Sequence, residues 1–270
     1  MDLKSLELDA AGLLSEVMYG HGFAHYGYFP EGPPETLSAA AFGAAQQAYF
    51  ERLVGAVPEG TKSILDVGSG TGANARALVK RGFDVTCVSP SVQMNEMARR
   101  KLPPGTEVID AKFEDYEGGE HDCCLFAESF HYIELQPAFD QLARVARQSI
   151  VIFDYFRRPG FAHGGGTRGT HAAFCEAVEA QGVFAIESDV DETDAIAPSF
   201  AIHDHIKNAH VAPFVKRFRS AFRAESRLKA WAAEKVLGRA LDKFERASSR
   251  SDSFPKEHEY RLVVLTRREA

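Results

Sequence analysis

The chain has 270 residues, of which 45% are hydrophobic and 26% charged, and its formal net charge is −7. This composition excludes disorder as the main state and allows one sizeable core, so we expect one domain with an elaboration rather than two independent domains. The negative charge gives no general reason to bind nucleic acid, and no apolar run reaches the roughly 20 residues that cross a bilayer. The start of the chain lacks the basic and then apolar order of a signal peptide, so we expect a cytosolic protein with small-molecule substrates and no membrane partner.

The first 60 residues precede the regular pattern of the chain. They contain the segment MYGHGFAHYGYFPEGPPE, which is dense in Tyr, His, Gly and Pro, and then a helix pattern over 37–57. We expect residues 1–60 to form an N-terminal lid and a helix.

Strand and helix patterns alternate after residue 60. The expected strands are 62–67, 83–88, 106–110, 122–127, 149–154, 183–189 and 259–267, and the expected helices are 73–81, 92–101, 135–147 and 168–181. Such alternation predicts a doubly wound, mostly parallel sheet with helices on both faces. The core should therefore comprise residues 61–190, and residues 251–270 should hold its last strand.

A stretch of about 60 residues, 191–250, separates the last two expected strands. Phe214, Phe218 and Phe222 recur there every four residues, as on one face of a helix. The part from Lys207 to Arg250 holds twelve Lys or Arg and four acids. We expect a helical cap that encloses a site together with the lid, and a homodimer surface is its alternative or additional role. The basic excess indicates a solvated face or, alternatively, an anionic substrate or acidic partner.

A glycine-rich turn follows the first expected strand, with Gly68, Gly70 and Gly72 in the spacing G-x-G-x-G. Glycine is needed where φ is positive or where a ligand approaches the backbone without a Cβ in the way. A dinucleotide fingerprint would have the spacing G-x-G-x-x-G, and here Ala73 stands in place of its third glycine. Asp66, two residues before the first glycine, would repel a pyrophosphate and suits a cationic group.

This turn resembles the S-adenosylmethionine (SAM) site of class I, Rossmann-like methyltransferases of small molecules. The resemblance covers about residues 20–190 and implies seven strands with an antiparallel last strand. The stretch KFEDYEGGEHDCCLFAESFHYIE is similar to the F-E-D and F-H-W-I segments of these enzymes. It implies that Phe113 and Glu114 lie along the adenine and that the Ala127 carbonyl meets the methionine ammonium. Asp110 is the alternative neighbour of the adenine.

The second expected strand departs from the family pattern. It should end in an Asp or Glu that accepts both ribose hydroxyls, and Ser89 stands there instead. Cyclopropane-synthase-like methyltransferases also have a hydroxyl residue at this place, so we expect Ser89 and Gln93 to share the ribose. Because a neutral hydroxyl is a weaker acceptor than a carboxylate, a SAM-binding protein without turnover is an alternative.

The segment H-Y-G-Y-F resembles the H-x-G-Y-F/W lid of small-molecule methyltransferases, whose aromatic side chains cover the methionine end of SAM. Aromatic faces beside a sulfonium gain cation–π attraction, so Tyr26 and Tyr28 are candidates for this role. Packing of the loop on the core is the alternative interpretation.

His131 comes just after the fourth expected strand, at the rim where the methyl group should lie. A neutral imidazole suits the removal of a proton from the acceptor, and Asp154, at the end of the fifth strand, is the next candidate. His203 and His205 would diverge on a helix, so we expect no metal site. The full set expected to bind SAM is Tyr26, Asp66, Gly68, Gly70, Gly72, Ser89, Pro90, Gln93, Phe113, Glu114 and Ala127, and the set expected to contact the acceptor is Tyr28, Phe130, Tyr155 and His203.

The sequence therefore predicts an enzyme that transfers a methyl group from SAM to O or N of a small molecule, by in-line displacement in an enclosed site. Within enzymes, the rival is a C-methyltransferase or a cyclopropane-synthase-like enzyme.

Overall fold

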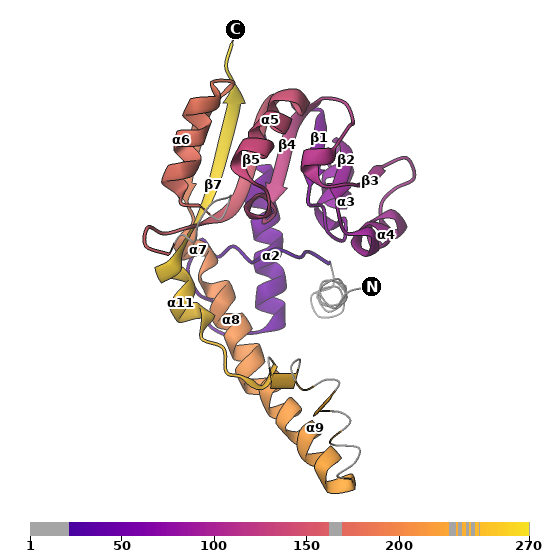
Figure 1. Cartoon of the computed structure of the whole chain (residues 1–270), viewed down its shortest axis with the longest axis vertical. Helices are drawn as coiled ribbons and strands as arrows, with labels where there is room; N and C mark the ends of the chain where they lie inside the picture. The colour runs from indigo at the N-terminus through magenta and orange to yellow at the C-terminus, as the bar shows by residue number, and fades with distance from the viewer. Residues whose placement is uncertain are drawn as a thin grey trace.

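A seven-stranded sheet in the order β3-β2-β1-β4-β5-β7-β6 lies in the upper part of the molecule in Figure 1. The computed structural model describes residues 22–161, 169–226 and 244–269, and the single residues 231, 234, 235, 238, 241 and 242. Strand β7 runs antiparallel to both of its neighbours, β5 and β6, whereas the pairs among β1 to β5 are parallel. The expected doubly wound, mostly parallel sheet is thereby confirmed. Part of the expected lid, residues 1–21, and much of the expected cap between 227 and 243 lie outside the described residues.

The strands are β1 (Ser63–Val67), β2 (Asp84–Ser89), β3 (Glu107–Asp110), β4 (His121–Ala127), β5 (Ala146–Arg157), β6 (Phe184–Asp191) and β7 (His258–Arg267). The helices are α2 (Ala39–Val54), α3 (Ala73–Lys80), α4 (Val92–Lys101), α5 (Leu135–Val145), α6 (His171–Gln181), α7 (Thr193–Ile196), α8 (Pro198–Ile206), α9 (Ala212–Glu225) and α11 (Arg250–Glu257). The main difference from the sequence patterns concerns β5, which is longer at both ends. Helix α5 stops at Val145 because Ala146 is already extended.

Short polar residues and glycines set several helix ends. The side chains of Ser91 and Thr170 accept hydrogen bonds from first-turn amides of α4 and α6, at 3.4 and 3.2 Å. Gly182 ends α6 in the left-handed conformation. Helix α3 differs, because Gly72 precedes it and no side chain caps its first turn. The amides of that turn remain available to a ligand.

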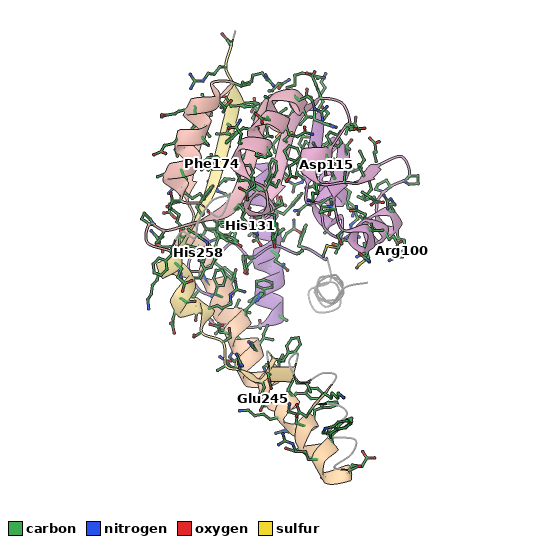
Figure 2. The ribbon with its side chains drawn as sticks, in the orientation of Figure 1. Arg100, Asp115, His131, Phe174, Glu245 and His258 are labelled. Carbon is green, nitrogen blue, oxygen red and sulfur yellow. The ribbon has the colours of Figure 1, made fainter. Side chains whose placement is uncertain are left out.

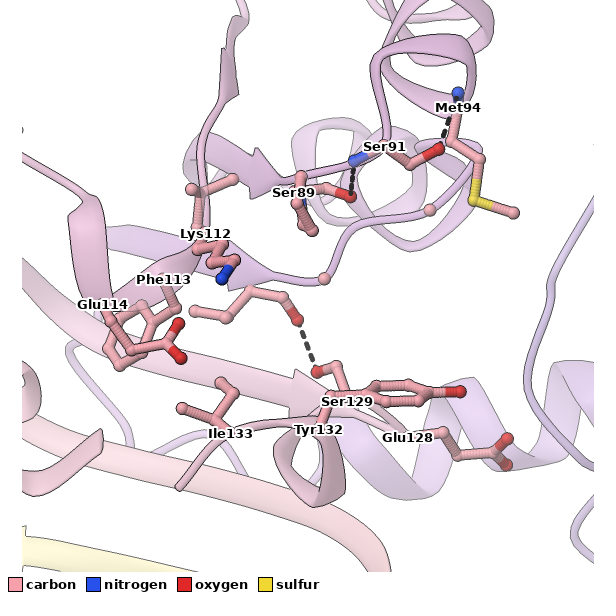
Figure 3. A pocket seen from close by; sticks show the side chains of 15 residues that line it. Ser89, Ser91, Met94, Lys112, Phe113, Glu114, Glu128, Ser129, Tyr132 and Ile133 are labelled. Atoms are coloured by element: carbon pink, nitrogen blue, oxygen red, sulfur yellow. Dashed lines mark hydrogen bonds between the residues drawn. The ribbon is translucent and has the colours of Figure 1, made fainter. Parts of the chain in front are cut away.

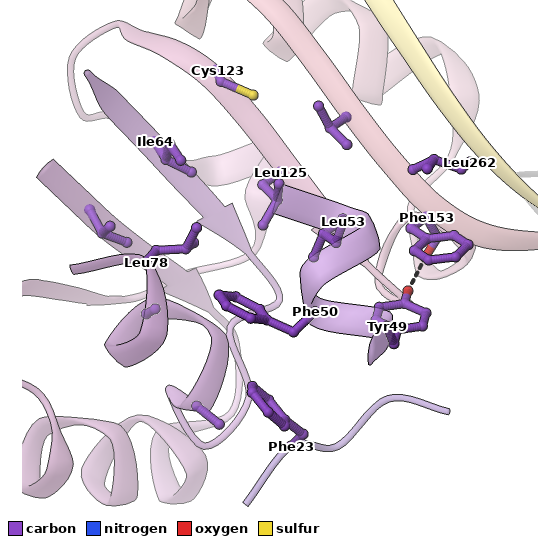
Figure 4. Close-up of a cluster of buried hydrophobic side chains, with 14 of the residues drawn as sticks. Phe23, Tyr49, Phe50, Leu53, Ile64, Leu78, Cys123, Leu125, Phe153 and Leu262 are labelled. Carbon is purple, nitrogen blue, oxygen red and sulfur yellow. Dashed lines mark hydrogen bonds between the residues drawn. The ribbon is translucent and has the colours of Figure 1, made fainter. Parts of the chain in front are cut away.

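Two apolar clusters cover the two faces of the sheet. One contains Tyr49, Phe50 and Leu53 of α2, packed on strand residues such as Leu125 and Phe153 (Figure 4). The other is formed by α5 and α6 against the opposite face, and it includes side chains of Phe130, Phe139 and Phe174. The site is therefore confined to the edges of the sheet, because both faces are filled.

Helices α7, α8, α9 and α11 lie between β6 and β7 in the chain. Ile196 and Phe200 of this insertion are fully buried, and the Ser199 hydroxyl bonds both the amide and the carbonyl of Gly27 at 2.9 Å. Helix α9 instead extends away from the sheet, and Phe214 on it is 66% exposed (Figure 1). The insertion thus has a docked part, which holds the N-terminal loop, and a projecting part. In the described residues, no helix is both long and apolar enough to cross a membrane.

Candidate functional site

Three adjoining cavities follow the carboxyl edge of the sheet, where doubly wound folds bind ligands. We number them from the glycine turn outward, and their volumes are 390, 230 and 300 Å³. The first and second cavities share Gly68, Gly70 and Glu128, and Tyr132 lines all three. The second and third also share His131 and Tyr155. The shared walls make these cavities successive parts of one site.

The three glycines of the turn have different roles. All three have positive φ, of 73° at Gly68, 54° at Gly70 and 77° at Gly72. A Cβ at Gly68 would lie 2.4 Å from Cβ of Ser129, and a Cβ at Gly72 would lie 2.8 Å from Cβ of Ala98. A Cβ at Gly70 would meet no protein atom closer than 3.9 Å. Gly68 and Gly72 therefore serve close packing, and Gly70 leaves space for a ligand.

The first cavity is lined by strand ends and the turns after them (Figure 3). Ser89 and Pro90 come from the end of β2, and Phe113 and Glu114 come from the turn after β3, as the sequence predicted for a nucleoside site. The Ser89 hydroxyl accepts a long hydrogen bond of 3.4 Å from the amide of Ser91. The residue pair Phe113 and Glu114 thus brings one aromatic and one carboxylate group to the wall of this cavity.

On α4, the cavity wall is formed by the neighbour of the residue that the sequence predicted. Met94 lines the first and second cavities, whereas Gln93 lines none of the three. Consecutive helix residues point about 100° apart, so only one of the two can face the cavity. Lys112 and Ile133 were also missed, although both lie within the quoted F-E-D and F-H-W-I regions.

Asp66 lies beneath the glycine turn rather than on a cavity wall. Its side chain is 1% exposed, and its Oδ2 atom has no hydrogen-bond partner among the described residues. Burial raises the pKa of this carboxyl to about 7. The expected direct contact with a cationic group is not supported by this placement.

Glu128, directly after β4, is an acid that lines both the first and the second cavity. It is a non-glycine residue with a φ of 55°, an uncommon conformation that often marks functional positions. Its Oε1 accepts the amide of Tyr26 at 2.6 Å and the hydroxyl of Tyr260 at 2.7 Å. Burial raises the pKa of this carboxyl to about 8. The sequence signal was an acid next to Ala127, which itself lines the second cavity.

His131 and Asp154 form a buried pair at the boundary of the second and third cavities. Nδ1 of His131 lies 2.8 Å from Oδ1 of Asp154, and the two side chains are 7% and 1% exposed. The amides of His131 and Tyr155 donate to the same carboxylate at 3.1 and 2.8 Å. When Nδ1–H donates to Asp154, Nε2 carries the lone pair and can accept a proton. Both sequence-predicted candidates for proton removal are therefore adjacent.

Tyr26, expected to bind SAM, and the four residues expected to contact the acceptor divide into two groups. Tyr26 lines the second cavity and packs on Phe200 with a centroid distance of 4.5 Å, and Tyr155 lines the second and third cavities. Tyr28, Phe130 and His203 line none of the three.

These three side chains are directed elsewhere for identifiable reasons. Phe130 is 1% exposed and belongs to the cluster beneath α5 and α6, because the turn Phe130–Tyr132 directs it to that face of the sheet. The Tyr28 ring meets the Phe153 ring edge-on, with 6.3 Å between the ring centroids. The His203 ring lies 4.7 Å from that of Phe42, and burial lowers its pKa to about 4.

The third cavity contains two residues that the sequence did not indicate, Arg157 at the end of β5 and His258 at the start of β7. They are opposite each other in the β5–β7 pairing. A separate group, His171, Cys175 and Asp189, has donor atoms within 4.8 Å of one another. His171 and Arg261 both bond Asp189 at 2.7 Å, so this carboxylate already has cationic or donor partners.

Sequence comparisons identify the family of the central part of the chain. Residues 65–153 match a family model described as a methyltransferase domain. The chain is 30% identical over 116 residues to an uncharacterized methyltransferase of Mycobacterium tuberculosis. This alignment covers 40% of the present chain and 48% of that protein. The chain is also 30% identical over 130 residues to a putative methyltransferase of a Geobacillus species, covering 44% and 53%. The chain thus spans about half the length of the curated relatives it matches.

Solved structures share the fold over almost the full chain. The [4+2]-cyclase SpnF has a TM-score of 0.71 at 16% identity, covering 99% of this chain and 96% of that one. A geranyl diphosphate C-methyltransferase from Streptomyces coelicolor, in complex with S-adenosyl-L-homocysteine, has a TM-score of 0.67 at 15% identity and covers 99% of both chains. At these identities the likeness shows the fold alone.

The cavities also fit SAM on their own geometry, with space at Gly70, an aromatic and acidic end at Phe113 and Glu114, and an acid at Glu128 for a cation. The sheet order and the glycine turn agree with the match over residues 65–153, which shows a methyltransferase domain in this part of the chain.

Proposed function

We propose that the protein transfers a methyl group from SAM to an oxygen or nitrogen of a small molecule. The observation that carries this proposal is the continuity of the site, which runs from the glycine turn to the His131–Asp154 pair through shared walls. In domain terms, we assign SAM binding to residues 61–190 with 251–270, the lid to residues 1–60 and the cap to residues 191–250.

The chain's residues can hold SAM in one orientation. Phe113 and Glu114 would lie along the adenine, and Ser89 would meet the ribose. Gly70 and Ala127 would border the methionine part, with the Glu128 carboxylate beside its positive charge. When bound, SAM supplies a methyl group on a sulfonium, which is already a strong electrophile. The protein's remaining tasks are to align the acceptor, exclude water and remove a proton where the acceptor carries one.

His131 is suited to the proton step. Its Nδ1 faces Asp154, which fixes the tautomer in which Nε2 accepts a proton and stabilises the imidazolium that results. The rings of Tyr132 and Tyr155 flank the imidazole, with centroid distances of 3.9 and 4.4 Å. Methylation of an O–H or N–H group releases one proton, and the His131–Asp154 pair can take it. Carbon methylation and cyclopropane formation also release a proton, so the screen for the acceptor must include carbon nucleophiles and alkenes.

The test combines binding and turnover. Calorimetry should show 1:1 binding of SAM and of S-adenosylhomocysteine (SAH), and a panel of phenols, amines and hydroxy acids should reveal acceptor-dependent release of SAH. Binding of NAD without SAM would contradict the cofactor assignment. Tight SAM binding with no SAH release by any acceptor would instead favour a SAM-binding protein without turnover.

A further inference from the structure

The third cavity extends beyond the His131–Asp154 pair, and its far wall comes from two antiparallel strands. Arg157 on β5 is directly opposite His258 on β7, so their side chains leave the same face of the sheet. Tyr155, two residues before Arg157, shares that face and completes the wall. The cavity therefore joins a proton acceptor at one end to a guanidinium and an imidazole at the other.

The acidic side chains that line the site belong to its first two cavities, and the described lining of the third cavity contains no acid. Glu128 and Asp154 occupy the end near the proposed sulfonium, and their partners are Tyr26, Tyr260 and His131. Among the described residues, no carboxylate lies within ion-pair distance of Arg157, whose Nη1 donates to the carbonyl of Phe161 at 3.0 Å. With one carbonyl partner in the described part of the chain, the Arg157 guanidinium retains donors for a ligand.

The groups around His258 indicate that an anion would bind favourably beside it. Burial, together with the positive charge of Arg157, lowers the pKa of His258, while Glu257 acts in the opposite direction. Phe254 stacks on the imidazole with a centroid distance of 4.8 Å, and Tyr155 meets it edge-on at 5.2 Å. The ring is thus held in place beside an arginine, and an anion bound between the two groups would pair with the guanidinium and favour the protonated imidazole.

We propose that Arg157 and His258 form an oxyanion subsite, which binds a carboxylate or phosphate group of the acceptor while the nucleophile of the same molecule lies at His131. Guanidinium groups recognise both oxyanions through charge-assisted hydrogen bonds. The cavity volume of 300 Å³ is at the lower end of ligand sites, which are about 300–1,000 Å³. The acceptor class is therefore a small hydroxy or amino acid or phosphate, such as a single-ring compound. This inference rests on the proposed function for the role of His131, but the oxyanion subsite is testable without turnover.

The experiment measures binding to the full-length protein saturated with SAH. Three probes carry a ring: para-hydroxybenzoate, para-hydroxyphenyl phosphate and the uncharged para-hydroxybenzamide. The fourth probe is inorganic phosphate, which has no ring that could fail to fit the cavity. Calorimetry should show at least about tenfold tighter binding of one oxyanion probe than of the amide. The preferred probe tells which oxyanion the subsite takes.

Variants assign the effect to the subsite. Arg157→Gln should remove the preference for the oxyanion, Arg157→Lys should restore part of it, and His258→Gln should weaken it by a smaller factor. Arg100→Gln is the matched control, because Arg100 is exposed on α4, on the far side of the molecule from His258 (Figure 2). SAH affinity should be unchanged in all four variants. If the protein methylates one of these acceptor compounds, Arg157→Gln should raise KM for the acceptors that carry an oxyanion and leave kcat nearly unchanged.

Three results would overturn the inference. They are equal binding of acid and amide, no binding of inorganic phosphate or any ring probe at millimolar concentration, and an equal loss of all probes in Arg157→Gln, which would mean that Arg157 only supports the chain near Phe161. Arg157-dependent oxyanion binding without SAH release by any acceptor would contradict the proposed function and leave the subsite standing.

Discussion

The cofactor end and the acceptor end of the site are built in different ways. The first cavity is lined by residues at or just after the carboxyl ends of four parallel strands, and much of its shape is set by backbone, above all at Gly68 and Gly70. The third cavity depends on side chains, His131, Arg157 and His258, from three separate stretches of the chain. The comparison shows how a site can keep one ligand and vary the other, because changes of side chain at the third cavity leave the glycine turn intact.

The largest effect should come from closing the cofactor end. Gly70→Val should reduce SAM and SAH affinity by about 100-fold, since overpacking a fitted site costs about 1–3 kcal/mol and the side chain would enter the first two cavities. Calorimetry measures this. Gly60→Val is the matched control, because Gly60 also has positive φ and a Cβ there meets no atom within 4 Å. Retained SAH affinity in Gly70→Val would show that the ligand does not pass over this glycine.

At the boundary of the two ends, His131→Ala should lower kcat by about 100-fold or more, the usual contribution of a general base, with SAM affinity little changed. Asp154→Asn should also lower kcat, because an amide in its place no longer fixes the productive tautomer. His205→Ala, an exposed position on α8, is the control. A His131→Ala enzyme with full rate and an unaltered pH profile would remove this residue from the mechanism.

Glu128 should couple SAM binding to pH. Its pKa is about 8 in the folded protein, so below that pH the carboxyl must lose a proton before it can meet a sulfonium as a carboxylate. SAM affinity relative to SAH should therefore rise with pH up to about 8 and then level off. Glu128→Gln should flatten this difference and weaken SAM by about tenfold.

Glu128 should also make the free energy of unfolding of the ligand-free protein depend on pH. The folded-state pKa of Glu128 lies above the ordinary glutamate value of 4.5, so between the two values the native state holds a proton that the unfolded state has lost. The free energy of unfolding of the ligand-free protein should then fall as pH rises through this range, and less so in Glu128→Gln. A steeper fall in the variant, measured by urea unfolding, would contradict the assignment.

The smallest effect is expected at the ribose. Ser89→Asp would supply the carboxylate that the family pattern has there, and a gain on the order of 1 kcal/mol corresponds to about fivefold tighter SAM binding. Lys112 lines the same cavity and can help to accommodate the new charge. Ser89→Ala is the companion variant and should weaken binding slightly. A large loss in Ser89→Asp would show that the ribose is held by other groups.

Sequence reasoning predicted the sheet well because its signals are local. Apolar runs bounded by glycines predicted the strands to within a few residues, apart from β5, and strand ends located the turn at Gly68 and the position of His131. The side-chain directions around the site were harder to predict. Phe130 and His131 are adjacent, yet Phe130 belongs to the core beneath α5 and α6 while His131 lines two cavities.

The sequence by itself determined the doubly wound fold, the glycine turn and the strand ends that form a SAM site, because periodicity and glycine spacing act over a few residues. Only the tertiary structure decided that Gly70 is the glycine open to a ligand, that Glu128 lies on the cavity wall whereas Asp66 does not, and that Arg157 faces His258. These features depend on which atoms of distant segments come into contact. The packing of Ser129 on Gly68, the bond from Tyr260 to Glu128 and the register of β5 with β7 set them, and no local pattern encodes such contacts.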